Sequence, residues 1–138
     1  MRGDDMYTHD GLRKYDISPK RYKELCGFCE QYPEWKEALK RMGVGVRAQA
    51  LDGMPHGTGT SDPTALIALK RSEIEERIML IEKVAAEADP EFSKQIVMNV
   101  CYEMPYYQLS MSHGLYISRN AFYTRRRKFF YLLSKKRL

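Results

Sequence analysis

Five of the six prolines in this chain stand where a helix is expected to begin. Ser18-Pro19, Asp62-Pro63 and Asp89-Pro90 each place a capping side chain before a proline, and Pro33 and Pro105 open further segments. Proline lacks a backbone N–H and its fixed φ suits the first turn of a helix, so it is favoured there. Long alternating patterns typical of strands are missing. We therefore predict an all-α fold.

Apolar residues recur at helical spacing in the segments that begin near Pro19 and Pro33. The first segment runs to about residue 31 and offers Tyr22, Leu25, Cys26 and Cys29 for a buried face. The second begins at Tyr32 and carries Trp35, Ala38, Leu39 and Met42. Gly43 is expected to end it, because glycine favours helix C-termini. Whether a helix resumes over Val44–Leu51 is left open.

A long central helix is predicted over Thr64–Ala88. Its isoleucines and alanines form a seam of seven-residue spacing, namely Ile67, Ile74, Ile81 and Ala88 with Ile78 and Ala85 beside them. The seam suits either a folded core or a dimer interface. Leucines and a valine on other sides of the helix, Leu66, Leu69, Leu80 and Val84, favour a core helix that is buried widely. Asp89-Pro90 is expected to end it and cap a further helix, with Phe92, Ile96, Val97 and Val100 as its apolar stripe.

The C-terminal region has the spacing of a helix-turn-helix. Pro105 can open a short helix over Tyr106–Ser112, residues 113–117 make a turn, and Ser118 caps a final helix of about eighteen residues. We predict a helical bundle with a long central helix and this C-terminal helix-turn-helix. The expected regions are a frayed N-terminus (1–14), an N-terminal helical region (15–51), a Gly/Pro-rich loop (52–62), the central and following helices (63–103) and the helix-turn-helix (104–138).

Cationic charge is concentrated at the C-terminus. The last twenty residues carry eight Lys or Arg and no Asp or Glu, whereas residues 1–118 hold fifteen Lys or Arg against eighteen acids. Four like charges side by side at 125–128 are favourable only with an anion nearby. Phe122, Phe129 and Leu133, flanked by Phe130 and Leu132, form the expected buried face, and Asn120, Tyr123, Thr124, Arg127, Lys128 and Tyr131 lie opposite. This pattern is typical of a helix laid against DNA. The plainer alternative is a solvated cationic helix whose aromatic side chains pack against the domain.

We therefore predict double-stranded DNA as the partner of the final helix. Amide, hydroxyl and guanidinium groups near its N-terminal end suit base edges, and the later cations suit phosphates. The predicted contact residues are Ser118, Arg119, Asn120, Tyr123, Thr124, Arg125, Arg126, Arg127, Lys128 and Lys135. About five phosphate contacts would give a log–log salt slope near −4 to −5. A homodimer is an expected way to gain affinity, because one short helix reaches few base pairs.

Two C-terminal segments, Tyr106–Leu109 and Ser118–Leu133, resemble the C-terminal half of phage-encoded transcriptional regulators of the RinA/ArpU type. The segments Tyr32–Trp35 and 54–64 also resemble those of phage proteins with this tail, and the resemblance covers about residues 15–137. It implies a helix-turn-helix related to sigma-factor region four and activation of late or morphogenesis operons. It also implies recognition roles for Arg119, Asn120, Tyr123, Thr124, Arg126 and Arg127.

Other functions fit parts of the sequence. The small subunit of a phage terminase also joins a helix-turn-helix to oligomerising helices, and a ring of eight or more chains would favour it. A protein-interaction module could instead dock its basic tail on host RNA polymerase without touching DNA. A nuclease would need the acids Glu73, Glu75 and Glu76, which beside Arg71 and Arg77 are more typical of a solvated helix face.

No enzyme, metal or cofactor is predicted. Cys26 and Cys29 have the spacing of a redox pair or half a zinc site, which Cys101 and His113 could complete, but no strand precedes them and the paired spacing is missing. Small core residues are the better interpretation. The Gly-rich stretch 53–60 lacks the Lys-Ser/Thr of a phosphate-binding loop, and His9, His56 and His113 have no nucleophile or metal-site spacing around them, so we expect them on the surface.

The expected location is the cytoplasm of a bacterial host. No window approaches eighteen uninterrupted apolar residues and no signal-type apolar core follows the N-terminus, so neither a membrane span nor secretion is indicated. Three cysteines are an odd number. That number does not suit a disulfide framework and agrees with a reducing compartment.

Overall fold

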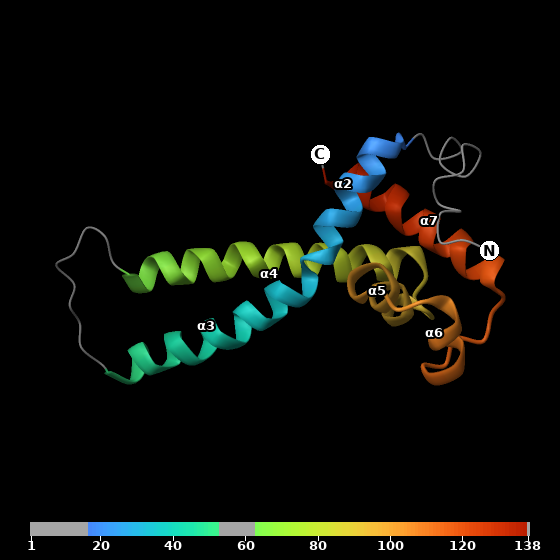
Figure 1. Cartoon of the computed structure of the whole chain (residues 1–138). Helices are drawn as coiled ribbons and strands as arrows, with labels where there is room; N and C mark the ends of the chain where they lie inside the picture. The colour runs from blue at the N-terminus through green and yellow to red at the C-terminus, as the bar shows by residue number, and fades with distance from the viewer. Residues whose placement is uncertain (1–16, 53–62, 138) are drawn as a thin grey trace. The chain divides into compact units, whose positions relative to one another are not determined.

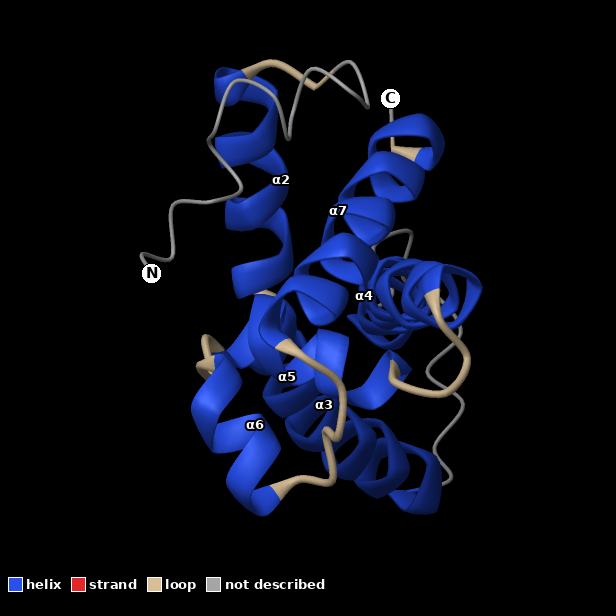
Figure 2. Ribbon diagram, turned by 90° about the vertical axis from the view of Figure 1, so that its right-hand side faces the viewer, coloured by secondary structure: helices blue, strands red, loops and turns tan. Residues whose placement is uncertain are grey.

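Helices account for all the regular structure in the residues that a computed structural model of the chain describes, 17–52 and 63–137. They are α2 (Pro19–Glu30), α3 (Tyr32–Asp52), α4 (Pro63–Ala88), α5 (Ser93–Tyr102), α6 (Tyr106–Ser112) and α7 (Arg119–Lys136) (Figure 1). Over these two ranges no strand is present (Figure 2). The predicted all-α fold, with its long central helix and C-terminal helix-turn-helix, is confirmed.

Side-chain capping explains the starts of two helices, α2 and α7. The Ser18 side chain accepts a hydrogen bond from the Arg21 N–H (3.1 Å), and Ser118 accepts one from Ala121 N–H (3.1 Å), which satisfies a donor that the first turn leaves free. Asp89 behaves differently from the prediction. Its carboxylate accepts from the Glu91 N–H (2.9 Å) and closes a turn, and α5 begins only at Ser93 without a side-chain cap.

The predicted stop at Gly43 is wrong, because α3 continues through Gly43 and Gly45 to Asp52. A helical glycine costs about 1 kcal/mol relative to alanine, which weakens a helix without forbidding it. Residues 44–51, for which the prediction was left open, therefore belong to the same continuous helix. The predicted loop, 52–62, begins one residue too early, because Asp52 is the last residue of α3. The rest of the loop, 53–62, lies outside the described residues, as do His9, His56 and the N-terminal region 1–14.

The chain divides into two compact units that do not follow chain order. Unit 1 combines the residues up to Gln31 with those from Leu80 onward, and unit 2 is Tyr32–Met79. The sequence grouped α2 with α3 in one N-terminal region. In the structure α2 instead belongs with the last turns of α4 and with α5, α6 and α7. The C-terminal helices are therefore built onto an N-terminal one.

Unit 1 has an aromatic and aliphatic core. Helix α2 packs against α5 and α7, and α5 also packs against α6 and α7. Tyr22 and Phe130 make an edge-to-face contact with ring centroids 5.0 Å apart, and Phe129 and Phe130 make another at 5.2 Å. The side chains that are completely buried include Leu25, Ile81, Ile96, Leu109, Phe122, Phe129, Phe130 and Leu133. Each such side chain contributes roughly 1.5–3 kcal/mol of burial free energy.

Unit 2 consists of α3 and the first part of α4. It buries Tyr32, Trp35, Ile74 and Ile78, and the Arg77 guanidinium lies 5.8 Å from the Trp35 ring centroid. The prediction that α4 is buried widely is wrong for its first turns, since Leu66 and Leu69 are 60% and 59% exposed. Within this unit α4 has one helix to pack against, so one face is covered. None of the described helices is long and apolar enough to cross a membrane.

Candidate nucleic-acid interface

The turn between α6 and α7 is held by several specific contacts. The N–H groups of His113 and Leu115 both donate to the Leu109 carbonyl (3.0 and 3.2 Å), and Leu115 is buried. Gly114 between them has φ +73°, a left-handed conformation that glycine adopts without strain. The Tyr106 hydroxyl donates to the Ile117 carbonyl (2.6 Å). The start of α7 is therefore placed by backbone and side-chain hydrogen bonds of α6 and the turn.

Helix α7 buries the face that the sequence predicted. Phe122, Phe129, Phe130 and Leu133 are fully buried, and Leu132 is half-buried. Tyr123 is a correction, because it was expected on the opposite face and is only 8% exposed. Two guanidinium groups of the same helix cover its ring, those of Arg119 (5.0 Å to the centroid) and Arg126 (5.6 Å). Cation–π stacking by residues four before and three after it removes this side chain from solvent.

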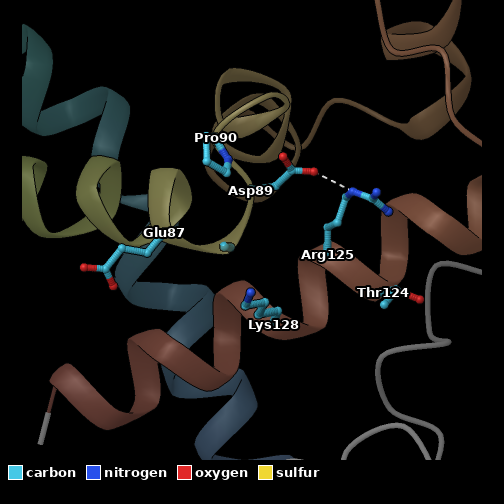
Figure 3. A pocket seen from close by; sticks show the side chains of 7 residues that line it. Glu87, Asp89, Pro90, Thr124, Arg125 and Lys128 are labelled. Atoms are coloured by element: carbon cyan, nitrogen blue, oxygen red, sulfur yellow. Dashed lines mark hydrogen bonds and ion pairs between the residues drawn. The ribbon is translucent and has the colours of Figure 1, made fainter.

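Arg125 is paired with an acid from outside its own helix. Its Nε lies 2.5 Å from Asp89 Oδ2, just after α4, and its Nη1 donates to the Ala121 carbonyl at 2.8 Å (Figure 3). The guanidinium charge is therefore balanced within the protein. The sequence predicted Arg125 as a DNA contact. In the structure its guanidinium group is instead engaged by Asp89 and by the Ala121 carbonyl.

Arg126 is also directed inward. Its Nε donates to Asn99 Oδ1 in α5 (2.6 Å) and its Nη1 to the Tyr22 hydroxyl in α2 (3.0 Å). The same guanidinium stacks on the rings of Tyr22, Tyr123 and Phe130. Burial raises the pKa of Tyr22 well above the usual range for tyrosine, so this hydroxyl stays protonated. Arg126 therefore joins three helices, and its predicted recognition role does not fit this placement.

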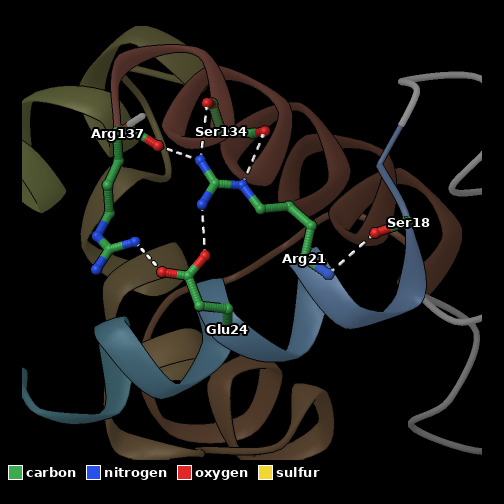
Figure 4. A network of polar contacts seen from close by, with 5 residues as sticks. All are labelled: Ser18, Arg21, Glu24, Ser134 and Arg137. Carbon is green, nitrogen blue, oxygen red and sulfur yellow. Dashed lines mark hydrogen bonds and ion pairs between the residues drawn. The ribbon is translucent and has the colours of Figure 1, made fainter.

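The end of α7 is tied to α2 and α4 by further ion pairs. Lys136 lies 3.7 Å from Glu87 of α4. Glu24 of α2 bridges Arg21 and Arg137, and Arg21 also donates to the Ser134 hydroxyl and carbonyl and to the Arg137 carbonyl (Figure 4). The hydrogen bond from Arg137 contributes most to lowering the pKa of the Glu24 carboxyl. Acids distant in sequence thus balance a helix that contains none.

Five of the predicted contact residues share one side of α7 with Tyr131. We call this row the outer stripe: Asn120, Thr124, Arg127, Lys128, Tyr131 and Lys135. Their spacing puts them on one side of α7, where Asn120, Thr124, Lys128 and Lys135 are exposed and Arg127 and Tyr131 half-exposed. Thr124 donates to the Asn120 carbonyl (3.0 Å) and accepts from Arg127 (3.2 Å). Neither Arg127 nor Lys128 has an ion pair with any residue the structure describes.

A hollow of about 440 Å³ adjoins the outer stripe. It is lined by Glu87–Pro90 and by Thr124, Arg125 and Lys128 (Figure 3). Its two acids, Glu87 and Asp89, are already engaged by Lys136 and Arg125. Of the two cations that line the hollow, Arg125 is paired and Lys128 has no ion pair with a described residue. The other predicted residues are accounted for as well, since Ser118 caps α7, Arg119 stacks on Tyr123 and Lys135 lies over Tyr131.

The cysteines pack in unit 1, as predicted. Cys29 and Cys101 are buried and Cys26 is half-buried. A hydrogen bond with Cys101, together with burial, raises the pKa of the Cys29 thiol, and burial raises that of Cys26. Among the described residues there is no group of three or more His, Cys, Asp or Glu side chains that could hold a metal ion. His113 is half-buried, and its carbonyl accepts a hydrogen bond from Gln95.

Sequence reasoning missed the polar residues of other helices that engage this region. Gln95 and Asn99 of α5 bond to the backbone on either side of α6. Asp89 and Glu87 neutralise cations of α7, and Glu24 neutralises Arg137 directly after it. No local signal marks these residues, because their partners lie elsewhere in the chain. Comparisons of the sequence with protein-family models and curated proteins, and of the fold with solved structures, gave no match.

Proposed function

We propose that this protein binds double-stranded DNA through the outer stripe of α7 and acts as a sequence-specific transcriptional regulator of a phage or prophage. The observation that carries the proposal is the row of amide, hydroxyl and cationic side chains on one side of α7, whose three cations have no ion pair with any described residue. Asn120 and Thr124 stand in the first turns of a capped helix, where a recognition helix meets base edges. Arg127, Lys128 and Lys135 follow toward phosphates.

Late-operon control and membership of the RinA/ArpU type are part of the same proposal, and they rest on the sequence resemblance. The helix-turn-helix of α6 and α7 agrees with that resemblance at the level of fold. We infer a binding protein and not an enzyme, because the sequence carries no catalytic constellation. The bacterial cytoplasm is the location that this function requires.

The internal ion pairs change the expected strength of the interaction. Eight cations in contact with phosphates would give a log–log salt slope of about −7, because each releases about 0.9 counterion. Arg125, Lys136 and Arg137 have ion pairs, and Arg119 and Arg126 are engaged by aromatic rings and neutral side chains. The three cations of the outer stripe, Arg127, Lys128 and Lys135, have no ion pair with a described residue and would give about −3 for one chain and about −5 for a dimer. A slope near −7 per chain would show that the internal pairs break on binding and would contradict the assignment to the outer stripe.

Two lysines of α7 provide a matched test. Lys128 is exposed and has no ion pair in the described structure, whereas Lys136 is paired with Glu87. Lys128→Ala and Lys136→Ala remove the same charge from the same helix. Fluorescence anisotropy with labelled duplex should show a slope about 0.9 less negative for Lys128→Ala and little change for Lys136→Ala. Equal losses from both variants would show that only total charge matters.

Base recognition is tested separately, after a binding selection from random duplexes. Asn120→Ala and Arg127→Ala should each reduce the preference for the selected duplex by about 1–3 kcal/mol, whereas Lys128→Ala should weaken all duplexes alike. Sedimentation of the wild-type protein decides the packaging alternative. A monomer or dimer agrees with transcriptional regulation, and a ring of eight or more chains would favour a small terminase subunit.

A protein-interaction function is favoured by one separate observation. On α6 the side chains of Tyr107 and Met111, one turn apart, are 64% and 81% exposed, and apolar surface of this kind is common at protein interfaces. Host RNA polymerase is the proposed partner for this alternative. Purified polymerase should then bind the wild-type protein and bind Met111→Asp more weakly, with no DNA present. Binding unchanged by Met111→Asp would remove the support from α6.

A further inference from the structure

Helix α5 carries two amide side chains one helical turn apart, and they hold the backbone on either side of α6. The Gln95 Nε2 donates to the carbonyl of His113 (2.7 Å), directly after α6. The Asn99 Nδ2 donates to the carbonyl of Met104 (2.8 Å), two residues before α6 begins. The first helix of the helix-turn-helix is therefore bracketed at both ends by one neighbouring helix.

Asn99 connects this bracket to α7. Its Oδ1 accepts the hydrogen bond from Arg126 Nε at 2.6 Å, while its Nδ2 is engaged by Met104. One amide thus bonds to the segment leading into α6 and to the helix that carries the outer stripe. Arg126 continues the connection to the Tyr22 hydroxyl of α2. The two helices of the helix-turn-helix are fixed against each other through α5.

Apolar packing alone would not fix this arrangement as tightly. Ile96 and Val100 of α5 and Leu109 of α6 are buried, and their burial favours contact without favouring one direction. Hydrogen bonds weaken steeply when their distance or angle departs from the optimum. Bonds at both ends of α6 therefore resist sliding and tilting of the helix, which apolar contacts tolerate.

We propose that Gln95 and Asn99 are positioning residues that set the sequence discrimination of the outer stripe by fixing α6 against α7. This inference rests on the proposed DNA-binding function. Neither side chain belongs to the outer stripe, and each acts through the backbone or the arginine that it holds. Base readout needs side chains held within about 0.5 Å of their productive positions, whereas phosphate attraction tolerates larger displacements. Loss of the bracket should therefore reduce discrimination more than general affinity.

Two substitutions by apolar side chains of similar length remove the bracket. Gln95→Met and Asn99→Leu delete the donors to the His113 and Met104 carbonyls and add no charge. Asn99→Leu also deletes the acceptor of the Arg126 hydrogen bond and should lower stability, so its duplex binding is measured at a temperature where it is folded. In the wild-type protein Gln95 Oε1 is buried without a hydrogen-bond partner in the described structure, so Gln95→Met also removes an unpaired acceptor and should cost little global stability. Gln108→Met is the control, because Gln108 is an exposed amide of α6 outside the bracket.

The first readout is the ratio of affinities for the selected duplex and for a scrambled one. We expect this ratio to fall about tenfold in Gln95→Met and Asn99→Leu, with the scrambled-duplex affinity and the salt slope unchanged. The second readout is hydrogen exchange at the His113 and Leu115 amides, which close the end of α6. Exchange there should be about fivefold faster in Gln95→Met and unchanged in Gln108→Met.

The possible outcomes separate the two proposals. A wild-type protein that binds no duplex at low salt refutes DNA binding, and unchanged exchange in Gln95→Met then refutes the bracket as well. A wild-type protein that discriminates between duplexes, together with variants that discriminate equally well, refutes the positioning role alone. Equal loss of affinity for both duplexes would show a general loss of folded protein, and would also overturn the inference.

Discussion

Arg126→Ala should destabilise the protein strongly, and Arg127→Ala should not, although the two arginines are neighbours with the same predicted role. Arg126 donates two side-chain hydrogen bonds, to Asn99 and to Tyr22, and stacks on three aromatic rings. Arg127 donates one, to exposed Thr124 at 3.2 Å. The structure therefore assigns one side chain to the interior contacts of unit 1 and the other to the outer stripe.

The expected magnitude follows from these contacts. A hydrogen bond from a charged donor contributes about 1.5–3 kcal/mol, and the lower end applies here because Arg126 is only part-buried. The ring contacts add about 0.5 kcal/mol each at such a site. Because the terms share one side chain and are not additive, we expect Arg126→Ala to lower the free energy of unfolding by about 3 kcal/mol. A Tm lower by roughly 10 °C would result. Arg127→Ala should cost less than about 0.5 kcal/mol.

Thermal and urea unfolding followed by far-UV circular dichroism measure this difference. Arg126→Lys is a useful third variant, because it keeps the charge and loses the planar fork that reaches Asn99 and Tyr22 together. It should fall between the wild-type protein and Arg126→Ala. At a temperature where all variants are folded, Arg127→Ala should show the weakened duplex binding. Equal midpoints for Arg126→Ala and Arg127→Ala would refute the assignment of Arg126 to the interior.

Three other predictions concern the acid that pairs with α7, the core and the cysteines. Asp89→Asn should free Arg125 for phosphates and make the salt slope of duplex binding more negative by about 0.9; an unchanged slope in a salt series would contradict this. Ile81→Ala should cost about 3 kcal/mol in urea unfolding, since Ile81 is fully buried, whereas Leu69→Ala should stay within about 0.5 kcal/mol, since Leu69 is 59% exposed. Thiol reagents at neutral pH should label the native protein slowly, because burial raises the pKa of Cys26 and a hydrogen bond with Cys101, together with burial, raises that of Cys29. All three thiols should react quickly once the chain is unfolded, and rapid labelling of the native protein would count against buried cysteines.

The helix boundaries could be read largely from the sequence. Ser18 and Ser118 cap their helices as predicted, and the short helix Tyr106–Ser112 begins after Pro105 as expected. Capping involves residues within three or four positions of each other, so its signals lie in a short window. Most of the buried face of α7 was equally predictable, because it follows from helical spacing. Tyr123 was not, because the rings and guanidinium groups around it bury a residue that spacing places on the other side. The stop at Gly43 was not, because packing or propensity over a longer stretch can outweigh a single glycine.

The tertiary structure decided which cations of α7 are available to a partner. Arg125 and Asp89 are 36 positions apart, Arg126 and Asn99 are 27 apart, and Arg137 and Glu24 are 113 apart. A sequence shows how many charges a helix carries and on which side they lie. Whether a charge is already balanced depends on which side chains folding brings within about 4 Å of it, and that distance is set by the packing of helices remote in sequence.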